Sequence, residues 1–231
     1  DYYTRELVSN YHFLIGRAYY QQYTQAVDPV KREELKKKAY LHFDKTSETG
    51  WDLDNMHINL ANIWRNEGIL DKATTEFLKA IETQPRKALS YFMLADMYRT
   101  NFGKTEEAVK LLEKGVSLYY YDQDANDAGA YYLLGALQME LAAKLRKGRD
   151  ISQLTADEAQ KHVELVTKAS NNIETALRGM PQNYMAYQNL GEAYFWLGRT
   201  SDAVFMWEKV IQINPSFYPA YANLAYYYGT I

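Results

Sequence analysis

The four histidines, at positions 12, 42, 57 and 162, are the side chains best suited to metal or acid–base chemistry. They fall in different predicted helices, and their separations do not match the regular spacing of metal ligands. The chain has no cysteine, which excludes thiolate metal sites and cysteine nucleophiles. We therefore expect packed or surface histidines and no metal site.

The acidic pairs Glu33-Glu34 and Glu106-Glu107 could act as general acid and base if a pocket held them. Each pair lies where a helix is expected to begin, and acidic side chains there favour the helix dipole. The sequence contains no Gly-x-Ser-x-Gly, P-loop or Gly-x-Gly-x-x-Gly motif. These observations predict a chain that is not an enzyme and has no catalytic, cofactor-binding or metal-binding residues.

Composition narrows the class of protein further. Of the 231 residues, 47% are hydrophobic, which is enough to build a sizeable core. The net charge of −3 argues against a general nucleic-acid binder, so we expect no nucleic acid as a partner. No run of about 18 apolar residues is present, which predicts no transmembrane segment. The chain begins at Asp1 and not at methionine, which we interpret as a fragment of a longer protein or a processed form.

Two basic clusters stand out along the chain. One comprises residues 31–32 and 36–38, and the other comprises residues 144, 146, 147 and 149. A run of charge is usually a solvated helix face, and we favour that interpretation. The alternative is contact with an acidic partner or an anionic lipid surface.

A repeated pattern covers nearly the whole chain and determines which elements position these side chains. Leu60 and Leu94 are 34 residues apart, and so are Leu190 and Leu224. Small residues recur opposite bulky ones around each leucine, as paired helices need where they approach closely. In two units this pattern comprises Ala61, Trp64, Ala73, Phe77, Ala80 and Pro85, and Gly191, Tyr194, Ala203, Trp207, Val210 and Pro215.

The period and these residues resemble the tetratricopeptide repeat family, whose unit is a pair of antiparallel helices of 34 residues. The resemblance implies an all-α fold, a right-handed α-solenoid of about five and a half helix pairs in one domain spanning 1–231. We place the units at about 9–53, 54–87, 88–127, 128–183 and 184–217, with a partial unit at 218–231.

The first and fourth units are longer than the family's pattern. Gly16 and Ala39, which mark the family's two small positions, are 23 residues apart, where the family has 12. Gly135 and Ala169, at the same positions of the fourth unit, are 34 residues apart. We expect extended helices in both units, with protruding hairpin tips.

The resemblance also implies that the first helix of each pair lines a concave groove. We expect its aromatic rings to anchor an extended segment or a helix of a partner, and its arginines to donate hydrogen bonds. The predicted partner-binding residues are Phe13, Arg17, Tyr20, Ile58, Asn62, Arg65, Phe92, Asp96, Arg99, Tyr132, Met139, Gln188, Glu192, Phe195 and Trp196.

A protein–protein interaction scaffold is therefore the predicted function, with a protein or peptide as partner and no cofactor. The alternative is a soluble accessory domain of a larger membrane-bound envelope enzyme, such as an O-antigen ligase-like protein or a glycosyltransferase. The family's clamp for C-terminal carboxylates is not predicted, because Phe13 and Phe92 replace its lysines. Tyr221, Leu224 and Tyr228 on the last helix could support self-association. The sequence does not distinguish the cytoplasm from the periplasm.

Overall fold

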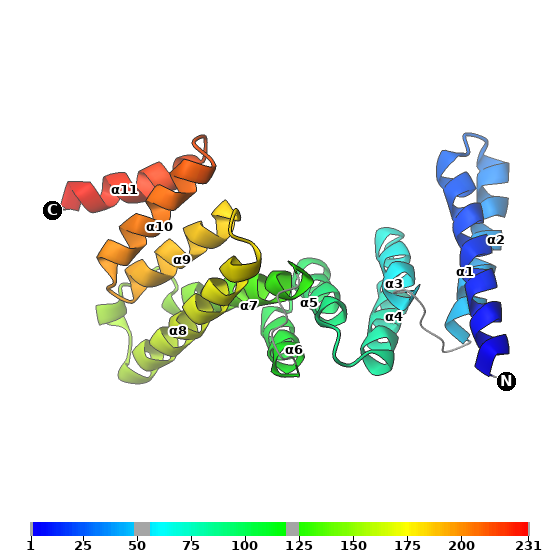
Figure 1. Ribbon diagram of the computed structural model, residues 1–231, viewed down its shortest axis with the longest axis horizontal. Helices are drawn as coiled ribbons and strands as arrows, with labels where there is room; N and C mark the ends of the chain where they lie inside the picture. Colours follow the sequence, from blue (N-terminus) through cyan, green and yellow to red (C-terminus); the bar gives the residue numbers. More distant parts are fainter. Residues whose placement is uncertain (1, 49–55, 119–124, 231) are drawn as a thin grey trace. The chain divides into compact units, whose positions relative to one another are not determined.

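The computed structural model describes residues 2–48, 56–118 and 125–230, and within these ranges it contains eleven α-helices and no β-strand. Figure 1 shows them in chain order. The all-α fold class is confirmed. The helices are α1 Tyr2–Gln25, α2 Pro29–Glu48, α3 Met56–Asn66, α4 Leu70–Thr83, α5 Ala88–Phe102, α6 Thr105–Ser117, α7 Ala125–Arg146, α8 Ala156–Gly179, α9 Tyr184–Trp196, α10 Thr200–Ile213 and α11 Tyr218–Thr230.

The helices pack in consecutive pairs within two compact units. The first unit comprises residues 1–90 and the second residues 91–231, so the boundary falls inside α5. In the first unit α1 packs on α2 and α3 on α4, and in the second unit α7 packs on α8 and α9 on α10 (Figure 1). The predicted repeat boundary at 53–54 lies outside the described residues, and the division into repeat units stays a prediction.

The predicted alternation of small and large residues produces the close helix contacts of the first unit. Phe43 of α2 and Phe77 of α4 are fully buried, and Trp64 of α3 packs edge-on against Phe43. Gly16 of α1 makes room for this core, because a Cβ atom there would lie 2.6 Å from the Phe43 ring. A larger side chain at position 16 would therefore push the two helices of the pair apart.

The core of the second unit follows the same rule. Ile173 of α8 and Trp207 of α10 are buried among alanines of the neighbouring helices. A glycine faces each of these side chains. A Cβ at Gly191 of α9 would lie 2.5 Å from the indole of Trp207, and a Cβ at Gly135 of α7 would lie 2.6 Å from Ile173. Helix α7 thus approaches α8, and α9 approaches α10, at the positions that the repeat pattern predicts.

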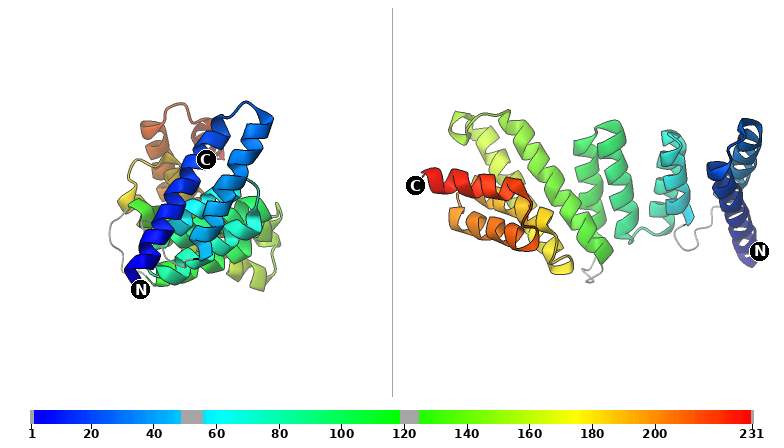
Figure 2. Two further views of the ribbon diagram at one scale, coloured as in Figure 1. Left: turned by 90° about the vertical axis from the view of Figure 1, so that its right-hand side faces the viewer. Right: turned by 90° about the horizontal axis from the view of Figure 1, so that it is seen from above.

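The extended helices of the first and fourth predicted units are confirmed. Helices α1 and α2 have 24 and 20 residues, and α7 and α8 have 22 and 24, whereas α3, α4, α9 and α10 have 11 to 14. Figure 2 shows the long α7 and α8 lying beside each other. The connection between α7 and α8 is stabilised by a capping box at Thr155 and by a bidentate ion pair between Arg149 and Glu158. In the described ranges, no helix is long and apolar enough to span a membrane.

Candidate partner-binding surface

An open groove lies between α1 and α3 in the first unit, and we call it the first-unit groove. Its volume is about 690 Å³, and it contains two predicted residues, Arg17 and Tyr20. Leu14 is 55% exposed there, which gives the groove an apolar wall. The guanidinium of Arg17 lies 5.7 Å from the ring centre of Phe13, which is itself buried. The groove is lined by Leu14, Arg17, Ala18, Tyr20, Gln21, Thr24 and Ile63.

The hydroxyl of Tyr20 is committed to a cluster around Glu67, directly after α3. Tyr20, Tyr23 and Tyr40 donate hydrogen bonds to the carboxylate of Glu67 over 3.0, 3.3 and 2.7 Å. Lys36 adds an ion pair at 3.3 Å. Burial and the bond to Glu67 raise the pKa of Tyr20 to about 12. This cluster ties α1 and α2 to the end of α3, so the hydroxyl of Tyr20 serves the fold.

The other predicted residues of the first unit divide by exposure. Ile58 of α3 is buried, with 4% of its surface exposed. Asn62 and Arg65 follow on the same helix and are half-buried. Of the residues predicted to bind a partner in this unit, Arg17, Asn62 and Arg65 are therefore accessible, whereas Ile58 is not.

In the second unit, we define the inner face as the predicted residues of α5, α7 and α9. These are Phe92, Asp96, Arg99, Tyr132, Met139, Gln188, Glu192, Phe195 and Trp196. Side-chain contacts link the three helices in order. Arg99 of α5 reaches Glu140 of α7, and Asn189 of α9 donates to the hydroxyl of Tyr132 over 3.5 Å. The equivalent positions of successive inner helices are therefore neighbours, as the repeat predicts.

Arg99 is engaged within the second unit. Its Nε lies 3.3 Å from a carboxylate oxygen of Glu140. Glu140 also accepts from Thr105 at 2.8 Å and pairs with Lys144 at 2.9 Å. Burial of Glu140 acts to raise its pKa, but these hydrogen bonds outweigh burial and lower it. The sequence identified Arg99 as a donor for a partner and did not identify Glu140, which holds it.

Two acceptors on α9 lack donors. Gln188 is 9% exposed, and its side-chain oxygen has no hydrogen-bond partner. Glu192, one turn later, makes no hydrogen bond or ion pair within the described residues, and burial raises its pKa although the charge of Arg146 opposes this. Buried polar groups in proteins are nearly always bonded, so the unpaired oxygen of Gln188 is an exception, whereas Glu192 is only half-buried.

Trp196 at the end of α9 is covered by the long helices α7 and α8. The guanidinium of Arg146 lies 5.2 Å from its ring centre, and the ring of His162 lies 5.5 Å away. His162 is buried, and neither of its ring nitrogens has a hydrogen-bond partner. Part of the extension of α7 and α8 therefore packs on α9.

Two histidines that are 30 residues apart in the chain meet in the first unit. The Nδ1 atoms of His12 on α1 and His42 on α2 are 2.9 Å apart. Burial lowers the pKa of both imidazoles, and the charge of Lys45 contributes. Among the described residues, no group of three or more potential ligands is placed to hold a metal ion.

Because of this histidine pair, we expect the folded protein to be less stable in mild acid. The unfolded imidazoles, with a pKa of about 6.5, take up protons more readily than the folded pair. The free energy of unfolding should therefore fall as the pH drops from about 7 to 5. In a variant with both His12→Gln and His42→Gln, urea titrations should give a smaller decrease. Some decrease should remain, because burial also lowers the pKa of His162. An unchanged pH dependence in the variant would contradict this assignment.

Comparison with known proteins found matches to one family over two parts of the chain. A family model described as "Tetratricopeptide repeat" matches residues 76–110, and a second model with that description matches residues 185–216. A curated relative, "TPR repeat-containing protein MJ1428" of Methanocaldococcus jannaschii, is 22% identical over 162 residues, which cover 68% of this chain. The matched part spans 29% of that relative's length.

Two solved structures illustrate the similarity of fold. MamA is 23% identical with a TM-score of 0.56, over 74% of this chain and 83% of that one. PilW, titled a type IV pilus biogenesis factor, is 15% identical with a TM-score of 0.52, over 89% of this chain and 77% of that one. At these identities the likeness shows the fold alone.

Proposed function

The chain is a helical repeat protein of the tetratricopeptide repeat family, and on this premise we propose that it is a protein-interaction scaffold whose inner helices hold a peptide segment or a helix of a partner. The observation that carries the proposal is the inner face of the second unit. There, the rings of Tyr132 and Phe195 are half-buried, and so is the carboxylate-bearing Glu192 of α9. Apolar contact area interrupted by a few polar groups is the usual chemistry of peptide recognition.

The first-unit groove supports the same proposal. Leu14 and Ile63 supply apolar surface from two helices, while Arg17 and Gln21 supply hydrogen-bond donors beside it. Concave surfaces of this kind between successive inner helices are where repeat proteins bind extended partners. We assign the chain no reaction of its own.

The proposal predicts that aromatic side chains of the inner face carry binding energy. Peptides selected from a random dodecapeptide library displayed on phage provide the probe, and fluorescence anisotropy measures their affinity. The double variant Phe92→Ala with Tyr132→Ala should bind a selected peptide well over tenfold more weakly, because truncating a buried aromatic anchor costs about 2 kcal/mol. Circular dichroism should show unchanged helix content.

The matched control is Phe205→Ala, which removes a ring that is 54% exposed on the outer helix α10. It should leave affinity unchanged. A second control, Lys31→Gln with Lys37→Gln, neutralises two exposed side chains of the basic α2 tip. If the tip variant loses the peptide and the inner-face variant keeps it, the binding surface lies on the projecting helices and the proposal fails.

A further inference from the structure

Helix α1 carries a row of exposed apolar side chains on the face opposite to its core. Leu7, Tyr11 and Leu14 are 69%, 57% and 55% exposed. Their spacings of four and three residues place them on one side of the helix, whereas Ser9 and Gly16 are buried on the other side. Large apolar side chains that line up on an exposed helix face are typical of a binding surface.

This row continues into the first-unit groove. Leu14 belongs to both, and Ala18 and Gln21 extend the same spacing along α1 and line the groove. We call the whole set the α1 stripe, which comprises Leu7, Tyr11, Leu14, Ala18 and Gln21. At the rise of an α-helix, the stripe is about 21 Å long. The stripe and the groove therefore form one continuous surface.

The groove presents a positive charge without a counter-ion. Among the described residues that line it, Arg17 is the only charged one, and its side chain is exposed. The guanidinium lies 5.7 Å from the ring centre of Phe13 and forms no ion pair within the described part of the chain. Glu67, which Tyr20 links to the groove, already accepts three tyrosine hydroxyls and pairs with Lys36. Arg17 is therefore available to a carboxylate from outside the chain.

The polar groups of the groove favour a helix over an extended segment as the bound partner. A helix bonds its own backbone N–H and C=O groups, whereas an extended segment leaves them to the surface that binds it. Thr24 donates to the backbone oxygen of Gln21, and the hydroxyl of Tyr20 donates to Glu67. Of the polar side chains in the described lining, those of Arg17 and Gln21 remain for a partner. Two such groups are too few to bond an extended backbone along the α1 stripe.

We propose that the α1 stripe and the first-unit groove bind an amphipathic helix of the partner, with an aspartate or glutamate of that helix paired with Arg17. Two helices whose apolar residues recur at spacings of three and four pack side by side along those residues. A carboxylate accepts two parallel hydrogen bonds from a guanidinium, and this contact sets the register of the bound helix. This inference rests on the proposed function and specifies the conformation and the charge of the bound segment.

Peptide selection tests the conformation and the charge of the partner. The intact chain is the target, and the probes are random peptides of about 20 residues displayed on phage, which are long enough to form a helix. A second step with the Leu14→Glu variant removes the peptides that bind elsewhere. The retained peptides should share an aspartate or glutamate among apolar residues spaced three and four apart. Circular dichroism should show that they gain helix on binding and that the variant keeps the helix content of the parent, because Leu14 is exposed.

A double-mutant cycle, followed by fluorescence anisotropy, measures the Arg17 contact. Arg17→Gln in the protein, or the amide in place of the shared acidic residue in the peptide, should each weaken binding about tenfold, because each leaves a charge without its partner. Both changes together should be little worse than either alone. The matched control Arg178→Gln removes an exposed guanidinium of α8 and should leave affinity unchanged. Equal losses in the two protein variants would show a general charge effect and would overturn the inference.

The outcomes separate this inference from the proposed function. The inference is overturned if no peptide is retained after the Leu14→Glu step, or if the retained peptides share no acidic residue or gain no helix. A dimer of the free chain in sedimentation velocity that Leu14→Glu dissociates would also overturn it, because a second copy would then cover the α1 stripe. In each case, peptides whose binding is lost in the Phe92→Ala and Tyr132→Ala variant would leave the proposed function standing. Failure to select any peptide that binds the intact chain would count against both.

Discussion

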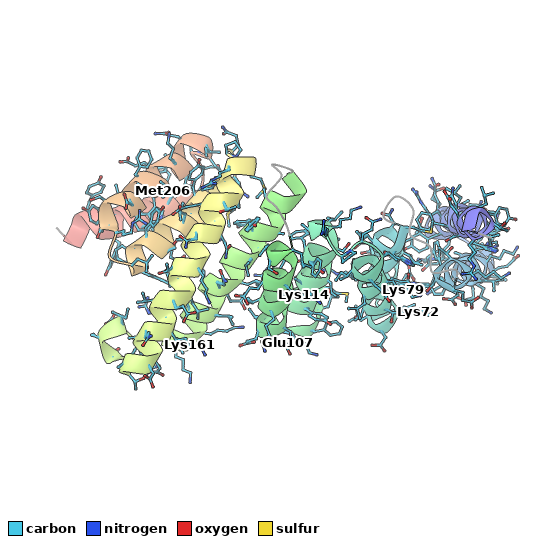
Figure 3. All side chains as sticks on the ribbon, turned by 60° about the horizontal axis from the view of Figure 1, so that its bottom comes forward. Lys72, Lys79, Glu107, Lys114, Lys161 and Met206 are labelled. Atoms are coloured by element: carbon cyan, nitrogen blue, oxygen red, sulfur yellow. The ribbon has the colours of Figure 1, made fainter. Side chains whose placement is uncertain are left out.

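Replacing Glu76 by alanine is expected to lower the free energy of unfolding by about 3 kcal/mol, because it leaves a buried polar network without its acceptor. Glu76 on α4 is 2% exposed. Its carboxylate lies 2.7 Å from Nδ1 of His57 on α3, accepts from Ser47 on α2, and lies 3.3 Å from Lys79. One carboxylate thus joins three helices of the first unit; Figure 3 labels Lys79 and Lys72 along α4.

Urea titration followed by circular dichroism measures this effect. The control is Glu82→Ala, on the same helix but exposed, which should change stability by less than about 0.5 kcal/mol. Burial acts to raise the pKa of Glu76, but the bonds from His57 and Ser47 outweigh it and lower the pKa. The contribution of Glu76 should therefore be present above about pH 4.5 and lost as the pH falls. Equal effects of the two variants would contradict the role of the network.

The second large effect is expected from Gly135→Ala in α7, which should cost about 2 kcal/mol. The added Cβ would lie 2.6 Å from Ile173 and 2.9 Å from the backbone oxygen of Ala169, both on α8. A side chain could turn away, but the helix backbone has to move as a whole. This close contact between the two long helices would therefore open, and both thermal and urea unfolding should show the loss of stability.

Gly129→Ala in the same helix provides a control of opposite sign. The nearest atom to a Cβ there is a ring carbon of Phe92 at 4.0 Å, an ordinary contact. Alanine should stabilise the helix by about 0.5–1 kcal/mol, because glycine loses more backbone freedom on folding. If both variants shift stability in the same direction, the α7–α8 contact differs from the one described.

The helices and their pairing follow from the repeat because its periodicity sets which face of each helix packs. Small residues such as Gly135 and Gly191 mark the close contacts directly in the sequence. The excess length between Gly16 and Ala39 correctly predicted longer helices. Asp28, just before α2, accepts a hydrogen bond from the backbone N–H of Lys31 and so caps the start of that helix.

Contacts between helices far apart in the chain were not predictable in the same way. The three tyrosines around Glu67 and the pairing of His12 with His42 depend on the crossing of α1, α2 and α3. A repeat pattern specifies the phase of a helix and not that crossing. Sequence spacing alone therefore carries no sign of these contacts.

The candidate surface shows the same division. The family pattern predicts that Gln188 and Glu192 share a face of α9, and their contribution to partner binding stays a prediction. The pattern does not predict that Gln188 is buried with an unpaired oxygen while Glu192 is half-buried, because burial and bonding depend on the neighbouring helices. Arg99 was predicted to bind a partner, but it pairs with Glu140, which is 41 residues away in the chain and so could not be identified from the repeat pattern.

Photo-crosslinking of a selected peptide tests the central claim, that the inner helices hold the partner, most directly. A benzophenone side chain placed in the peptide would be activated in the complex, and mass spectrometry would identify the attached residue. Attachment to the inner face of the second unit, on α5, α7 or α9, is the predicted result. Attachment confined to the outer helices α6 and α10, or to the tips of the long helices, would contradict the account.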